Sequence, residues 1–283
     1  MIIDFHVHSF PPEVAPKVLY SLGVEKARIQ PFTDGTLEGV RRGMKDAGID
    51  YSVNLPVPTN MKQVVKLNRL AIETKEEHFA QGIINFGGMH PAYEDYKSII
   101  KDLASHGIPG IKIHPSYMGI DIDDIRFLHV IDAASEAGLA IITHAGLDIG
   151  IYDRNYCTVD HILKIIDEVR PETFILAHMG NWGFWDEVEK YLCGAPVWFD
   201  TAFSLGQTVA NPLAKEPPYP KDKLTPDSFT RLCRKHGIDH ILFGTDSPWG
   251  DQVVEVNQLK ALDFTKEELD MIFSENARKI LHI

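Results

Sequence analysis

Ile2-Ile3-Asp4-Phe5-His6-Val7-His8 is the stretch of sequence that decides the fold. Its apolar start is typical of a β-strand, and on a strand two histidines at positions i and i+2 share one face. Two neutral imidazoles held side by side supply half of a tetrahedral zinc site, or part of a larger divalent-metal site. The remaining ligands must then come from later in the chain.

Four later apolar runs each end in a side chain that can bind a metal. The runs cover residues 111–114, 140–144, 174–178 and 241–246, and they end in His114, His144, His178 and Asp246. In a parallel barrel the carboxyl ends of the strands meet at one mouth, which is where such enzymes hold their chemistry. Packing alone does not readily explain five runs that bring the same kinds of side chain to one place.

Strand-like and helix-like runs alternate along the whole chain. The expected strands lie near residues 2–8, 49–56, 79–86, 109–114, 139–144, 173–178, 196–201 and 240–245. The expected helices cover residues 36–47, 62–77, 93–105, 123–137, 159–169, 185–192, 226–235, 251–261 and 266–280. This order predicts an α/β fold, a (β/α)₈ TIM barrel, in a single domain over residues 1–283. The last helix is an extra C-terminal one, and Thr265-Lys-Glu-Glu268 at its start is a capping-box pattern.

Composition narrows the class of protein. The chain has 28 Lys and Arg against 40 Asp and Glu, a net charge of −12, which disfavours nucleic acid as a partner. The three cysteines lack a Cys-x-x-Cys spacing, and no signal-type stretch opens the sequence, so we expect a reduced, cytoplasmic protein. No apolar run approaches the roughly 20 residues of a membrane helix. A homodimer is compatible with the sequence.

Two connections are too long to be plain turns. They cover residues 9–35 and 202–225, and both follow strands, so both should lie over the mouth of the barrel. We interpret them as candidate lids. The alternative is that they are packed surface insertions or contacts between copies of the chain.

Taken in order, seven motifs resemble the amidohydrolase superfamily. They are Asp4-Phe-His-Val-His8, Gly88-Met-His-Pro91, Gly110-Ile-Lys-Ile-His-Pro115, Thr143-His-Ala-Gly146, Ala177-His-Met-Gly-Asn181, Gly244-Thr-Asp-Ser-Pro248 and Asn276-Ala277. The resemblance is to the amidohydrolase-related branch, which includes decarboxylases of the aminocarboxymuconate-semialdehyde and resorcylate type. It implies a metal-dependent (β/α)₈ enzyme with His6, His8, His144 and Asp246 around the metal. It does not imply a substrate.

The residue types also suggest a chemistry. A divalent ion held by imidazoles and one carboxylate keeps net positive charge and lowers the pKa of bound water toward about 7. Asp246 can bind the metal, orient the water and pass on its proton, although Asp246-Ser-Pro could equally open a turn. His178 is either a ligand of a second metal or a base and electrophile beside the first, and the alternative is a core histidine.

Lys112 has three possible roles. It stands two residues before His114, so both side chains face one side of their strand, and a lysine buried there is costly unless it is paired or neutral. Related binuclear amidohydrolases carry a carbamylated lysine at this place, and Lys112 with His178 could build such a two-metal site. The other roles are an ammonium that contacts the substrate or a water, and a structural ion pair. We expect zinc, with one ion favoured and two possible if Lys112 is carbamylated.

Four residues are candidates for binding a small-molecule substrate. His114 could contact it or act behind the metal ligands, and a structural role is an equal alternative. Arg154 could anchor a substrate anion, because its fork suits a carboxylate; otherwise it is an exposed arginine bound to Asp148 or Asp153. Asn181 and Trp249 follow expected strand ends and could line the pocket.

These observations predict a metal-dependent hydrolase. Metal-activated water would attack a C–N or C–O bond of a small, carboxylated substrate, with Asp246, His178 and Lys112 as the catalytic side chains. The first alternative is a non-oxidative decarboxylase of the aminocarboxymuconate or resorcylate type. The others are a TatD-like nuclease, in which Lys112 would replace a glutamate, and a catalytically silent metal-binding barrel.

Overall fold

The computed structural model describes residues 1–219 and 222–283, so residues 220 and 221 of the expected lid 202–225 lie outside the described residues. The strands of the described part are β1 Ile3–Val7, β2 Tyr51–Asn54, β3 Ile83–Asn85, β4 Gly87–Gly88, β5 Gly110–Ile113, β6 Ala140–Thr143, β7 Phe174–Leu176, β8 Trp198–Asp200 and β9 Ile241–Leu242. All are buried along their length except for the ends of β2 and the start of β8, as the two-sided cover of a parallel sheet requires.

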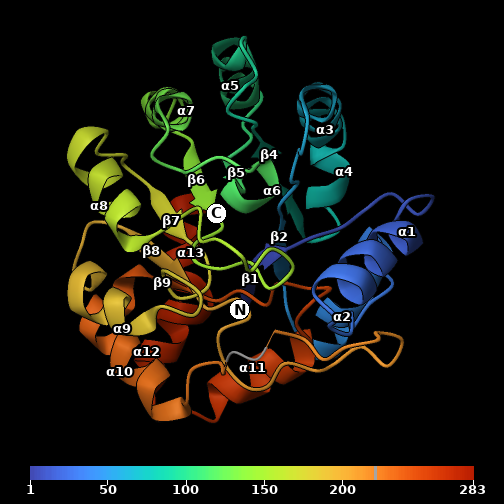
Figure 1. The fold of residues 1–283 in the computed structure, drawn as a ribbon, viewed down its shortest axis with the longest axis vertical. Coiled ribbons are helices and arrows are strands. Elements are labelled where there is room, and N and C mark those ends of the chain that lie inside the picture. The colour runs from blue at the N-terminus through green and yellow to red at the C-terminus, as the bar shows by residue number, and fades with distance from the viewer. Residues whose placement is uncertain (220–221) are drawn as a thin grey trace.

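The strands close into a barrel (Figure 1). They pair in parallel as β1-β2-β3 and as β4-β5-β6-β7-β8-β9. Only Phe86 separates β3 from β4, and its amide donates to Asn54 O at 3.1 Å, so β3 and β4 form one interrupted strand. On the other side, the Phe5 amide donates to Phe243 O at 2.7 Å and joins the first strand to the last. The predicted (β/α)₈ barrel is confirmed.

Helices surround this barrel because each has one apolar face to bury. They are α2 Leu37–Ala47, α3 Met61–Glu73, α4 Lys75–Phe79, α5 Tyr96–Ser105, α7 Ile125–Glu136, α8 Val159–Glu168, α9 Trp185–Glu187 continued by the π-helix Val188–Leu192, α10 Pro226–His236 and α11 Gln252–Lys260. A 3₁₀ turn, Ile238–His240, leads into β9. Gly48 ends α2 in the left-handed conformation at φ 70°.

The C-terminal helix is present as expected. It consists of α12 Lys266–Asp270, a π-helical turn Met271–Glu275 and α13 Asn276–Leu281. Thr265 Oγ1 accepts from the Glu268 amide, and the Glu268 side chain accepts from the Thr265 amide, which confirms the capping box.

The expected boundary between the helix 62–77 and the strand 79–86 was wrong at both elements. The expected helix 62–77 divides at Thr74, whose hydroxyl donates to Leu70 O at 2.8 Å, and a second short helix, α4, runs to Phe79. The expected strand at 79–86 therefore begins only at Ile83. Helical structure persists to Phe79 because no glycine or proline interrupts the charged segment after Thr74.

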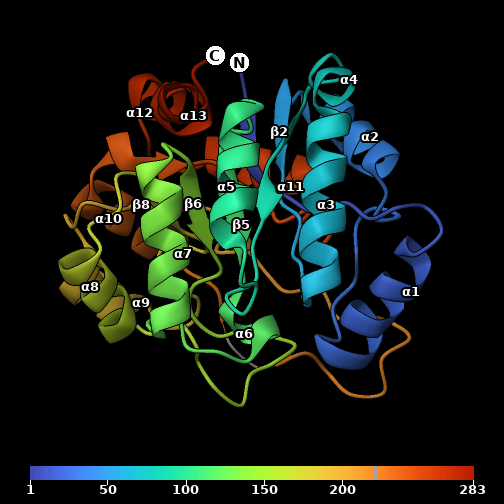
Figure 2. The same cartoon turned by 90° about the horizontal axis from the view of Figure 1, so that it is seen from above.

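Apolar side chains fill the end of the barrel at which the strands begin. Ile3, Phe5, Phe86 and Ile142 are buried there in one cluster, and the rings of Phe5 and Phe86 meet edge to face at 5.7 Å. Figure 2 shows both chain termini at this end, while α1 Ala15–Leu19 and α6 Pro115–Met118 lie at the opposite end. Polar side chains that need access from outside must therefore lie at the carboxyl ends of the strands.

The two expected lids contact each other. The first, residues 9–35, contains α1 and a π-helix Tyr20–Lys26, which the sequence did not lead us to expect. Ile29 forms an antiparallel bridge with Ala210, and the Gln30 amide donates to Val209 O at 2.9 Å. The Arg28 guanidinium binds Glu216 at 2.9 Å. The two long connections are thus joined to each other, and that they act as lids over the mouth stays a prediction.

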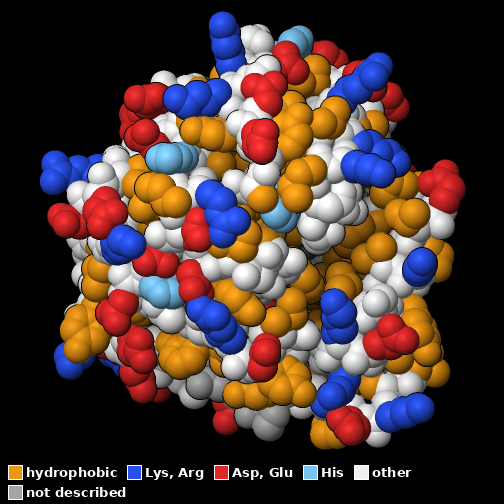
Figure 3. Space-filling view, turned by 45° about the horizontal axis from the view of Figure 1, so that its top comes forward, with side chains coloured by type: hydrophobic (Ala, Val, Ile, Leu, Met, Phe, Trp, Pro, Cys, Tyr) orange, Lys and Arg blue, Asp and Glu red, His pale blue; other side chains and the backbone are white. Residues whose placement is uncertain are grey.

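The charge distribution on one face and the length of the helices are two further features of the described part of the chain. On the face drawn in Figure 3, Lys and Arg side chains are interspersed with Asp and Glu side chains. Within residues 1–219 and 222–283, no helix has the length and apolar character needed to cross a bilayer.

Candidate metal centre

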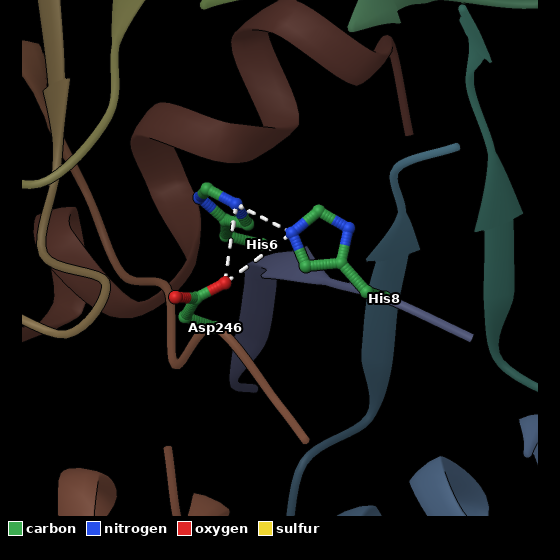
Figure 4. A group of neighbouring side chains, drawn as sticks. All are labelled: His6, His8 and Asp246. Carbon is green, nitrogen blue, oxygen red and sulfur yellow. Dashed lines mark hydrogen bonds and ion pairs between the residues drawn. The ribbon is translucent and has the colours of Figure 1, made fainter. Parts of the chain in front are cut away.

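Three predicted ligands meet at the mouth of the barrel. His6 lies on β1, His8 follows it, and Asp246 follows β9. The two Nε2 atoms of His6 and His8 are 3.2 Å apart, and Asp246 Oδ1 lies 3.6 Å from the first and 3.3 Å from the second. Figure 4 shows the carboxylate and both imidazoles directed at one point. The His-x-His pattern and the last strand therefore converge as the sequence indicates.

The protonation of these imidazoles shows that a cation fits between them. His6 Nδ1 donates to Asp200 Oδ2 at 2.7 Å, and His8 Nδ1 donates to Leu55 O at 2.7 Å. Each neutral ring therefore carries its proton on Nδ1 and presents a lone pair at Nε2. Two lone pairs and a carboxylate oxygen at these distances repel one another unless a cation lies among them. A carboxylate and a carbonyl behind the imidazoles are also the usual orienting partners of metal-binding histidines.

Burial sets the charges of this group. It lowers the pKa of His6 well below its usual value, so that this ring is neutral and able to bind a metal. Burial alone would raise the pKa of Asp246, but its contacts with the imidazoles of His8, His6 and His178 outweigh burial and lower that pKa to about 2. His6 therefore offers a neutral nitrogen, and Asp246 a carboxylate, at neutral pH.

His144 and His178 form a second pair of nitrogen donors. They follow β6 and β7, and His178 Nε2 lies 3.1 Å from His144 Nδ1. His178 Nδ1 donates to Ala202 O at 2.9 Å, whereas the buried His144 Nε2 has no hydrogen-bond partner in the described part of the chain. The ring of His144 stacks on that of His114 at 4.3 Å. That His144 and His178 bind a metal stays a prediction.

A second set of ligand atoms lies close together in this region. It consists of His114, His144 and Asp148, and Asp148 Oδ2 lies 3.5 Å from His114 Nε2. Burial raises the pKa of Asp148 to about 6. His144 therefore also lies close to His114 and Asp148, and its predicted place around a metal with His6, His8 and Asp246 stays a prediction.

Lys112 reaches the centre of the site from β5. It is 1% exposed, and its amine lies 3.3 Å from His6 Nε2. Burial lowers the pKa of Lys112 to about 8, although the charges of Asp200 and Asp246 oppose that effect. The amine is thus available both as an ammonium near neutral pH and, once deprotonated, for modification.

Two site residues occupy an uncommon backbone region. His178 and Asp246 both have φ near 62°, in the left-handed region that favours glycine. The Asp246 amide donates to His6 O at 2.8 Å, and the His178 amide donates to Asp200 Oδ1 at 2.8 Å. Neighbouring strands therefore hold both residues in place, and such strain is concentrated at functional sites.

The candidate substrate residues lie in different surroundings. His114 accepts from the Tyr117 amide at 3.4 Å and so caps α6. Asn181 is fully buried and donates to Cys157 O at 2.6 Å. Trp249 packs against the apolar cluster above the mouth.

Arg154 does not reach the site. Its side chain is 56% exposed, binds Asp121 and lies over the ring of Tyr156 at 4.9 Å. Arg154 is therefore the exposed, paired arginine of the alternative rather than an anchor in the site, and its partner is Asp121 instead of the expected Asp148 or Asp153. The loop that carries Arg154 turns outward, where the Asp121 carboxylate and the Tyr156 ring both contact the guanidinium.

Sequence reasoning missed two side chains of the site. Asp200 is a carboxylate at the end of β8, and the pattern of polar side chains at strand ends could have revealed it. Asp148 stands four residues after His144, in a loop with no periodicity to interpret.

The sequence profile of the Amidohydrolase family matches residues 3–283. The chain belongs to the amidohydrolase family. This confirms the resemblance inferred from the motifs, and no curated protein matches the chain.

Solved amidohydrolase-type barrels share the fold at low identity. 5-Carboxyvanillate decarboxylase from Sphingomonas paucimobilis is 14% identical with a TM-score of 0.71, covering 100% of this chain and 99% of its own. The corresponding enzyme from Novosphingobium aromaticivorans, with bound manganese, is 15% identical with a TM-score of 0.70, covering 100% and 97%. 2,6-Dihydroxybenzoate decarboxylase from Rhizobium is 11% identical with a TM-score of 0.69, covering 99% and 98%.

Proposed function

We propose that this amidohydrolase is a metal-dependent, non-oxidative decarboxylase of a small carboxylated substrate. The position of Lys112 carries the proposal, because its amine lies 3.3 Å from His6 Nε2. A substrate carboxylate bound there would contact this ammonium and the positive ion that His6, His8 and Asp246 would hold. The decarboxylases among the similar structures support this reaction over the hydrolysis that the residue types first indicated.

The metal-binding side chains present are suited to one divalent ion, for which we propose zinc. Bound among His6, His8 and Asp246, such an ion supplies positive charge that stabilises negative charge developing on the substrate. Asp200 and Leu55 O keep the two imidazoles oriented by accepting from their Nδ1 atoms. Lys112 binds the carboxylate that is lost.

Decarboxylation also requires a proton donor. Breaking the carbon–carboxyl bond releases carbon dioxide and leaves an electron pair on the substrate carbon, which must accept a proton. Lys112 and His178 are both close to the metal-binding group, and burial lowers the pKa of each. Only Lys112, with its pKa lowered to about 8, keeps its proton at neutral pH, so we assign proton return to its ammonium.

Reaction in D₂O tests the proposal. The metal-loaded protein is incubated with 5-carboxyvanillate, 2,6-dihydroxybenzoate and related hydroxybenzoates, while carbon dioxide and product deuterium are measured. We expect one deuterium at the carbon that lost its carboxyl for each carbon dioxide released, and loss of this activity in Lys112→Gln. Cleavage of amide or ester substrates with uptake of oxygen-18 from water, and no carbon dioxide from any acid, would contradict the proposal.

One observation favours hydrolysis as a second candidate. His144 Nδ1 and His178 Nε2 lie 3.1 Å apart, and together with a carbamylated Lys112 they would provide ligands for a second metal. This arrangement predicts two metals per chain and an intact mass raised by one carbon dioxide at neutral pH. Decarboxylation predicts one metal and an unmodified Lys112.

A further inference from the structure

Lys223 lies in the long connection 202–225, and the carboxylate whose charge acts on it most strongly, that of Glu255, is not within ion-pair distance. Lys223 is half-buried, and its Nζ lies 3.6 Å from the centroid of the Phe203 ring. With residues 1–219 and 222–283 its side chain makes neither a hydrogen bond nor an ion pair within 4.0 Å. An ammonium held over an aromatic face is stabilised by the ring but keeps its capacity to bind an anion.

The backbone fixes the place of this amine. The Leu224 amide donates to Ser204 O at 2.9 Å, and Leu205 forms a parallel bridge with Leu224. Phe203 has a φ of 54°, and its carbonyl accepts from Trp182 Nε1 at 3.3 Å. The pairing of Leu224 with Ser204 and Leu205 thus holds residue 223 beside residue 203, and Trp182 fixes the backbone of Phe203.

This arrangement adjoins the metal-binding group. Ala202, directly before Phe203, accepts from His178 Nδ1. The charges of Glu255 and Asp246 both act on Lys223, and Asp246 is one of the three side chains that could hold a metal ion. Phe203 also belongs to the apolar cluster above the mouth, which contains Trp182 and is packed by Trp249.

We propose that Lys223 is the substrate's distal anion-binding residue, and that the substrate is a planar acid with a second negative group remote from the carboxylate it loses. This deepens, and rests on, the proposed decarboxylase function. Lys112 holds the reacting carboxylate, the aromatic side chains face the planar part, and Lys223 binds the remote anion. Lys223 therefore takes the role that the sequence suggested for Arg154, which lies outside the site.

Binding of two probe acids tests this assignment without measuring turnover. Isophthalate carries two carboxylates on one ring and benzoate carries one, so their affinities for the metal-loaded protein are compared by calorimetry. We expect wild type to prefer isophthalate, and Lys223→Met to reduce that preference roughly tenfold, as the loss of one charge-assisted contact implies. Lys223→Arg should retain most of it. Lys215→Met, which removes an exposed lysine of the same connection, is the matched control and should leave the preference unchanged.

The outcomes separate this inference from the function on which it rests. An unchanged preference in Lys223→Met overturns the anion-binding role even if the protein decarboxylates benzoates. Equal losses for both acids, together with a lower melting temperature, also overturn it, because they show Lys223 to be a structural partner of Glu255. The role is also overturned if wild type does not bind isophthalate more tightly than benzoate. A selective loss in a folded, metal-loaded variant supports it whether or not carbon dioxide is released.

Discussion

Replacing Asp200 by asparagine tests how the second layer of the site controls the metal-binding group. Asp200 is fully buried and accepts three hydrogen bonds. Oδ2 accepts from His6 Nδ1 at 2.7 Å, while Oδ1 accepts from the His178 and Ala202 amides at 2.8 and 3.1 Å. Asparagine has one acceptor oxygen and one donor nitrogen. Either His6 or the two amides must therefore face an N–H group instead of an oxygen.

The expected loss can be worked from this geometry. Removing the carboxylate behind a metal-binding histidine costs roughly 10- to 100-fold in metal affinity. That corresponds to about 1.4 to 3 kcal/mol, which is consistent with one charge-assisted hydrogen bond. We therefore expect Asp200→Asn to bind zinc 10- to 100-fold more weakly than wild type.

Competition with a chromogenic chelator at fixed pH measures this affinity. Asp263→Asn is the matched control, because the Asp263 side chain is fully exposed on the far helical layer. Circular dichroism establishes that both variants are folded. A folded Asp200→Asn that binds zinc within twofold of wild type would refute the reasoning that Asp200 orients His6.

Three further predictions concern the scaffold. Burial lowers the pKa of His236 to about 4, so between about pH 6.5 and 4 the unfolded chain binds one more proton than the folded chain. The free energy of unfolding therefore falls by about 3 kcal/mol as the pH drops through this window. His236→Gln should remove that contribution in urea titrations at pH 7 and 4.5, and an unchanged pH dependence would argue against it. Gly146 has a φ of 93°, and the Cβ of Gly146→Ala would lie 2.1 Å from the Trp182 amide nitrogen. We therefore expect denaturant unfolding to show a destabilisation of at least about 3 kcal/mol. A loss under about 1 kcal/mol would be inconsistent with this contact. Thr265→Ala breaks the capping box and should cost about 1 kcal/mol in thermal unfolding, with Thr265→Ser retaining most of the stability; equal losses in both would discount the cap.

The fold could be predicted because it depends on short-range patterns. Strand ends at His6, His144 and His178 are marked by apolar runs, and the glycines and caps mark several helix ends. These signals lie within a few residues of the feature they set. The short helix α4 could not be predicted, since charged residues that suit a helix also suit a turn.

That His6, His8 and Asp246 lie together could be predicted from the convergence of strand ends. Asp200 escaped notice although it ends β8, because its partner His6 is 194 residues away and sequence does not show that contact. Arg154 was placed wrongly for the converse reason. Its charge suggested an anchor, but the direction of its loop depends on Asp121 and Tyr156, which sequence does not place beside it.

Lys223 shows most clearly which side-chain positions could not be predicted from the sequence. Its amine is set by backbone contacts between residues 204–205 and 224 and by the ring of Phe203, all within one long connection. Long connections have no periodicity from which side-chain direction follows. The residues that choose a substrate on a common barrel are therefore those that the sequence reveals least.

Metal content per chain is the most direct test of the central claim that His6, His8 and Asp246 hold a catalytic metal. Wild type and the double variant His6→Ala/His8→Ala are reconstituted with zinc, desalted and measured by elemental analysis, with circular dichroism as the check on folding. We predict about one zinc per chain in wild type and almost none in a folded double variant. Equal zinc in both proteins, or none in reconstituted wild type, would contradict the account.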